Sequence, residues 1–136
     1  MGYTRYWNRT EKPITTDFVL AVCAIIAECN DKGIMIRNGW GGGNPVVTME
    51  TIAINGDDST NLSHETCYFD NVNKGFDFCK TARKPYDYAV RKILEVAEIE
   101  GLITDVRSDG ENNEIISDED FIRKYSSDTK VYKRGY

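Results

Sequence analysis

The stretch FDFCKTARKPYDYAV, residues 76–90, contains the change from strand to helix around which the rest of the chain is organised. Phe76 and Phe78 alternate with polar residues, a pattern that predicts a strand. Pro85 suits the first turn of a helix, because that turn does not use the missing N–H group and needs the φ angle that proline already has. Apolar residues then recur at helical spacing until Gly101 ends the helix. The stretch therefore predicts a strand followed closely by an amphipathic helix.

Similar patterns on both sides of this stretch predict an α+β fold, an antiparallel sheet of five to six strands with two main helices packed on one face. Thr15 or Thr16 suits the cap of the first helix, which is apolar almost all round and is expected to be deeply buried. The opposite sheet face is expected to be free for a ligand or for a second copy of the chain. The strands are expected over residues 3–9, 34–37, 46–55, 64–70, 76–81 and 102–107.

Length and charge limit the classes of partner. The 136 residues predict a single domain over 1–125 and a polar tail over 126–136, with a short helix starting near residue 117. A net charge of −5, from 17 Lys and Arg against 22 Asp and Glu, argues against broad attraction to duplex nucleic acid or anionic lipid. No apolar run is long enough to span a bilayer, so we expect a soluble protein of the cytoplasm.

The cysteines and the single histidine predict neither a metal site nor a cofactor. The four cysteines contain no C-x-x-C pair, and His64 has no second ligand at a usable spacing for zinc. Two interpretations of Cys79 stay open: a thiolate whose pKa is lowered by the neighbouring Lys80, or a buried thiol.

A basic run just before the predicted second helix indicates an anion site. The N-terminus of a helix presents unpaired N–H groups and about half a positive charge. Lys80, Arg83 and Lys84 would add three full charges there, with Arg83 able to bind two oxygens of a phosphate. The alternative is a solvated loop whose charges offset Asp77 and Asp87.

Three further residues are candidates for the same ligand site. Tyr86 would flank it, and Arg107 would add charge from the last strand. Trp7 or Tyr86 would stack on a base, although aromatic residues such as Trp7 are more often packed within a strand.

No set of residues predicts catalysis. Asp57, Asp58, Glu65 and Asp70 are acidic, but nothing in the sequence brings two of them to one point. His64 lies between Ser63 and Glu65, and neighbouring residues of a strand point to opposite faces, so they do not form a triad. We therefore expect a protein that is not an enzyme.

Three blocks of sequence resemble a family of small phage and prophage proteins. They are GYTRYW (residues 2–7), FCKTARKPYD (78–87) and SDG (108–110), and their order covers nearly the whole chain. The resemblance implies a phage-borne accessory protein that acts in the bacterial cytoplasm, and by itself it implies no activity.

The size and order of elements are also similar to those of the Thoeris anti-defence sponges, phage proteins that bind a cyclic ADP-ribose signal without cleaving it. No ligand residue is carried over from that similarity. Taken with the basic run, it favours an immune-evasion protein that sequesters a small anionic, nucleotide-derived signal. The alternative is a phage inhibitor that binds a host protein directly, and a phosphoester-processing enzyme ranks last.

Overall fold

The computed structural model describes residues 3–109 of the chain. The predicted helix near residue 117, the predicted polar tail 126–136 and the predicted domain boundary at residue 125 lie outside the described residues. The fold below is therefore that of residues 3–109.

Six strands in this range form two antiparallel sheets, which confirms the predicted α+β class and divides the strands between two sheets. Consecutive strands β4 (Cys67–Asp70) and β5 (Gly75–Lys80) do not pair with each other, because β5 pairs with the N-terminal strand β1 (Thr4–Arg9) instead. The first sheet has the order β5 (Gly75–Lys80), β1 (Thr4–Arg9), β6 (Ile103–Ser108), and the second the order β2 (Val46–Val47), β3 (Thr51–Ile54), β4 (Cys67–Asp70).

Two predicted strands differ in the structure. The strand expected over 46–55 is the hairpin β2–β3, because the Thr48 hydroxyl accepts hydrogen bonds from the backbone N–H groups of Glu50 (3.1 Å) and Thr51 (2.9 Å) and closes a turn. The strand expected over 34–37 is reduced to one antiparallel bridge between Arg37 and Asn55.

The helices begin and end close to the predicted signals. The N-cap of α1 (Thr16–Asp31) is Thr15, whose hydroxyl accepts a hydrogen bond from the Phe18 N–H group at 3.1 Å. Pro85 lies in the turn just before α2 (Asp87–Ile99), and Gly101, with φ of 80°, follows its end. Neither helix of the described range has the length and apolar character needed to cross a membrane.

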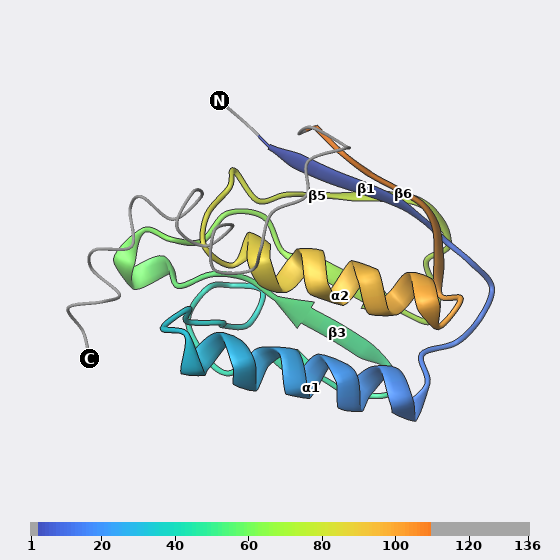
Figure 1. Ribbon diagram of the computed structural model, residues 1–136, viewed down its shortest axis with the longest axis horizontal. Coiled ribbons are helices and arrows are strands. Elements are labelled where there is room, and N and C mark those ends of the chain that lie inside the picture. Colours follow the sequence, from blue (N-terminus) through green and yellow to red (C-terminus); the bar gives the residue numbers. More distant parts are fainter. Residues whose placement is uncertain (1–2, 110–136) are drawn as a thin grey trace.

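The prediction that α1 is deeply buried is wrong for one side of that helix. Phe18 and Val22 are fully buried, but Leu20 is 62% exposed and Cys23 is also exposed. The helix packs against α2 and β2 on its inner side, and its outer side is open at Leu20. Figure 1 shows the two helices side by side beneath the β5-β1-β6 sheet, which is seen nearly edge-on.

Alternation along β1 sends its residues to two different environments. Trp7 points inward, is 1% exposed and stacks on Phe69 with ring centroids 5.5 Å apart. Tyr6 points to the opposite face of the sheet, together with Phe76 and Phe78 of β5, which are 59% and 42% exposed. The β5-β1-β6 sheet therefore has one face in the core and one face open, as the sequence predicted for one side of a sheet.

Candidate functional site

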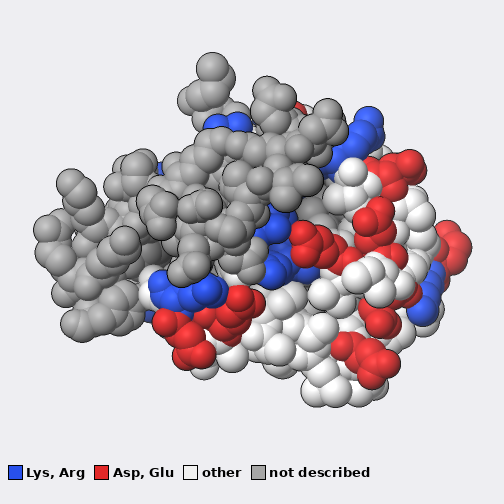
Figure 2. All heavy atoms as spheres, in the orientation of Figure 1, with Lys and Arg blue, Asp and Glu red and all other residues white. Residues whose placement is uncertain are grey.

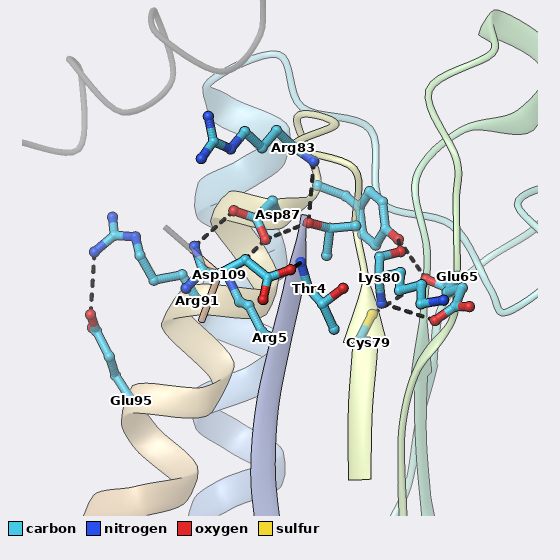
Figure 3. A network of polar contacts seen from close by, with 12 residues as sticks. Thr4, Arg5, Glu65, Cys79, Lys80, Arg83, Asp87, Arg91, Glu95 and Asp109 are labelled. Carbon is cyan, nitrogen blue, oxygen red and sulfur yellow. Dashed lines mark hydrogen bonds and ion pairs between the residues drawn. The ribbon is translucent and has the colours of Figure 1, made fainter. Parts of the chain in front are cut away.

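The three cations of the basic run do not converge. The Arg83 guanidinium lies 4.5 Å from the Tyr3 ring centroid, whereas the Lys84 ammonium donates to the Asn61 carbonyl at 3.1 Å. The Lys80 ammonium lies 6.0 Å from the ring centroid of Phe78. Figure 3 shows the Lys80 and Arg83 side chains pointing in opposite directions. The predicted shared anion site at the start of α2 is therefore not formed by these residues.

A tight turn between β5 and α2 causes this divergence. Ala82 and Arg83 both have positive φ angles, 54° and 57°, and the Lys84 N–H group donates to the Thr81 carbonyl at 3.0 Å. This is the φ pattern of a type I′ turn, which glycine and asparagine favour and other residues adopt at a cost. The turn reverses the chain between Lys80 and Lys84, so these neighbours in sequence point to different sides of the molecule.

A carboxylate of the protein occupies the start of α2. Asp87, in the first turn, is fully buried, and its oxygens accept from Arg5 Nε (2.7 Å), Arg5 Nη2 (2.8 Å) and the Thr81 hydroxyl (2.7 Å). An acidic side chain in the first turn is stabilised by the helix dipole. The N-terminus of α2, which was predicted to attract an external anion, therefore stabilises the carboxylate of Asp87.

The strained turn leads to a prediction for Ala82. Replacement of Ala82 by glycine removes the clash of Cβ in the left-handed region, and we expect the free energy of unfolding to rise by about 0.5 kcal/mol, since the glycine also loosens the unfolded chain. The control is Ala89→Gly in the first turn of α2, which should lower the same quantity by about 1 kcal/mol. Urea unfolding followed by circular dichroism measures both changes, and equal losses in the two variants would contradict the assignment of strain.

Segments from the start of β1, the turn after β5 and the end of β6 meet at one end of the first sheet. The Tyr3 carbonyl accepts from the Thr81 N–H group at 2.9 Å and the Ala82 N–H group at 3.2 Å. The Asp109 carboxylate accepts from the Thr4 N–H group at 3.1 Å (Figure 3). Residues far apart in the sequence thus support one another at the end of β1 where the two edge strands leave the sheet.

The structure gives Trp7 and Tyr86 no exposed ring face, so the predicted stacking of these two residues on a ligand is wrong. Trp7 packs in the core against Phe69. Tyr86 is fully buried, its hydroxyl donates to the Glu65 carbonyl, and burial raises its pKa. Trp7 follows the alternative interpretation given above, packing within a strand, whereas tertiary contacts bury Tyr86.

Cys79 is a buried thiol, which decides between its two interpretations. A hydrogen bond with Cys67 makes the largest contribution to raising the pKa of Cys79 well above its ordinary value, and burial of the thiol raises it further. The thiol is therefore protonated at neutral pH and is a weak nucleophile, even though Lys80 is its neighbour in sequence.

The open face of the β5-β1-β6 sheet carries an aromatic row whose members the sequence analysis did not bring to one surface. The ring centroids of Tyr6 and Phe76 are 6.1 Å apart, as are those of Phe76 and Phe78. Lys80 lies two residues beyond Phe78 on the same strand face and is exposed. We call this surface, together with Arg107, the aromatic face.

Arg107 reaches the aromatic face because β6 contains a bulge. The register of β1 with β6 shifts between Tyr6 and Asn8, and Asp105 at the bulge has a φ of 55°. One extra residue in β6 lets Val106 pack against the core while Arg107 lies opposite Tyr6 and is exposed. Lys80 and Arg107, two of the predicted site residues, are therefore brought to one surface.

The Tyr6 ring is held in place by a hydrogen bond at its outer end. Its hydroxyl donates to Asp109 at 2.8 Å, and this bond, with the negative charge of Asp109, raises the pKa of Tyr6. The hydroxyl is therefore protonated at neutral pH, and the carboxylate is already engaged by Tyr6 and by the Thr4 N–H group.

The alternation of Phe76 and Phe78 was the only local signal for this surface, and it indicated a strand without indicating which face would be exposed. The pairing of β1 with β5 and β6, which places Tyr6 and Arg107 beside them, is a long-range property.

In comparisons with known proteins, the chain matches no family model, no curated protein and no solved structure.

Proposed function

We propose that this is a phage-encoded immune-evasion protein that binds a small anionic, nucleotide-derived signal on its aromatic face and sequesters it without cleaving it. The observation that carries the proposal is a row of aromatic rings on the open sheet face, the half-buried Tyr6 with the exposed Phe76 and Phe78, flanked by Lys80 and Arg107. Aromatic faces stack on nucleobases, and each stacked base contributes about 1–3 kcal/mol. The two cations supply the attraction for phosphate.

The charge distribution favours a local site. Figure 2 shows that acidic side chains predominate over basic ones on the described part of the helix face, in keeping with the net charge of −5. Lys80 and Arg107 supply positive charge on the open face of the first sheet, and long-range attraction of the acidic protein to a polyanion contributes little.

Binding without cleavage is supported by the chemistry of the face. Its side chains as defined above are aromatic rings, which stack, and cations, which pair with phosphate, and beside them on the same sheet face the Asn8 amide donates to the Asp105 carboxylate at 3.0 Å. Asp109 is a carboxylate at the edge of the face, and it already accepts hydrogen bonds from the Thr4 N–H group and the Tyr6 hydroxyl. Neither of these two partners is a base that could activate a nucleophile.

The first test is a calorimetric titration with cyclic ADP-ribose isomers, cyclic dinucleotides and inorganic phosphate. We expect a nucleotide probe to bind, and the double variant Lys80→Gln with Arg107→Gln to bind it about 10-fold more weakly or worse, because two charge-assisted contacts are lost. The bound probe should be recovered unchanged after the protein is denatured.

The matched control is Lys84→Gln, which removes a lysine of the same basic run that contacts Asn61 instead of the aromatic face. We expect its affinity to equal that of the parent protein. A loss in Lys84→Gln as large as in the double variant would place the site at the helix start, and silence from every probe at high micromolar concentration would refute binding.

A second candidate function is supported by the same exposure. Phe76 and Phe78 are large apolar side chains on an open strand face, a feature also found where a protein partner binds. If the protein inhibits a host protein, a pull-down from host lysate should recover one stoichiometric partner. Capture of that partner should depend on Phe76 and Phe78 but little on Lys80 and Arg107.

A further inference from the structure

We infer that the ligand of the aromatic face contains two nucleobases and two phosphate groups, the composition of a 5′-phosphorylated or cyclic dinucleotide. This inference rests on the proposed function and deepens it, because it specifies how much of the face the ligand uses. It follows from the length of the aromatic row and from the positions of its two cations.

The length of the row favours two bases over one. Successive ring centroids are 6.1 Å apart, well beyond the roughly 3.4 Å between bases stacked directly on one another. Phe76 and Phe78 lie next to each other along β5, with Tyr6 beside them on β1, and the exposed rings of Phe76 and Phe78 each offer a surface to a base. One base would leave most of the row exposed to water, whereas two bases cover the exposed rings of Phe76 and Phe78 together.

The cations favour two phosphates. Lys80 lies beside Phe78, with its ammonium 6.0 Å from that ring centroid. Arg107 lies on the other edge strand, opposite Tyr6, where its charge acts on the Tyr6 hydroxyl. β1 separates the two edge strands that carry them, and a ligand with two phosphates offers each cation its own partner.

The face is organised before the ligand arrives. All its residues lie on paired strands, and the Tyr6 ring is fixed by its hydrogen bond to Asp109. A preformed stacking surface binds with a small loss of side-chain freedom. It also needs bases whose faces are accessible, which excludes a duplex because its bases are stacked on one another.

The experiment compares matched probes of increasing length by calorimetry. The probes are the four ribonucleoside 5′-monophosphates, the 5′-phosphorylated and cyclic dinucleotides of the same bases, and single-stranded octanucleotides. We expect a dinucleotide to bind about 10-fold or more tightly than its monophosphate, since a second stacked base and a second charge contact are added. The octanucleotide arm distinguishes a free dinucleotide from a segment of a longer strand.

Variants then assign the gain to the face. Phe76→Ala should remove most of the advantage of the dinucleotide over the monophosphate, and Lys80→Gln and Arg107→Gln should each remove part of it. Trp40→Ala is the matched control, because Trp40 is 89% exposed and belongs to none of the three strands. Phe76→Ala and Trp40→Ala should both keep the melting temperature of the parent protein, since both side chains are exposed.

The outcomes separate this inference from the proposed function. Equal affinities for monophosphates and dinucleotides would overturn the two-base ligand and leave nucleotide binding standing. An advantage of the dinucleotide that Phe76→Ala leaves intact would also overturn it, because the second base would then lie elsewhere. Binding by none of the probes, with Phe76 and Phe78 needed for capture of a host protein, would overturn both.

Discussion

Replacement of Gly56 by alanine is expected to lower the free energy of unfolding by about 3 kcal/mol or more. A Cβ atom at this position would lie 1.9 Å from the Leu62 carbonyl oxygen and 3.0 Å from Cδ1 of Tyr86. Leu62 and Tyr86 are both buried, and the Leu62 N–H group donates to the Asp57 carbonyl at 2.9 Å. The obstacle is therefore backbone that is held in place, and the whole turn must move to admit one methyl group.

Urea unfolding followed by circular dichroism and tryptophan fluorescence measures this loss. The matched control is Gly42→Ala, because a Cβ atom at Gly42 would have no atom within 4 Å. We expect Gly42→Ala to change stability by less than about 0.5 kcal/mol. If the two variants unfold at the same urea concentration, the close approach of residues 56 and 62 is wrong.

Replacement of Asp87 by asparagine is expected to cost about 3–5 kcal/mol, the range for breaking a buried ion pair. Asp87 is fully buried and Arg5 is 8% exposed, and they share two hydrogen bonds of 2.7 and 2.8 Å. The amide keeps the shape of the carboxylate but leaves the Arg5 guanidinium buried without an opposite charge. The substitution also removes the negative charge that stabilises the start of α2.

Two controls belong with this measurement, again by urea unfolding. Glu95→Gln breaks the exposed pair with Arg91, which spans one helical turn, and should cost less than about 0.5 kcal/mol. The double variant Arg5→Met with Asp87→Leu removes both charges and should recover most of the loss. A cost below about 1 kcal/mol for Asp87→Asn would contradict the buried pair.

Sequence patterns were reliable wherever a few neighbouring residues determine the structure. The Thr15 cap and the termination of α2 at Gly101 were predicted because capping bonds and left-handed residues act within one turn. The strand at residues 76–80 followed from its alternation. The turn at 82–83 was not predicted, because neither Ala82 nor Arg83 is typical of positive φ angles and long-range contacts hold them there.

By itself, the sequence determined that this protein is an α+β fold with its helices near residues 15–31 and 85–100, and that positive charge gathers around residue 80. Tertiary structure alone decided which of those charges share a surface. The pairing of β1 with both β5 and β6 brings Tyr6, Phe76 and Arg107 together, and the turn at residues 82–83 separates Lys80 from Lys84. The physical reason is that strand pairing joins residues across nearly the full described chain, whereas charge and periodicity report only on near neighbours.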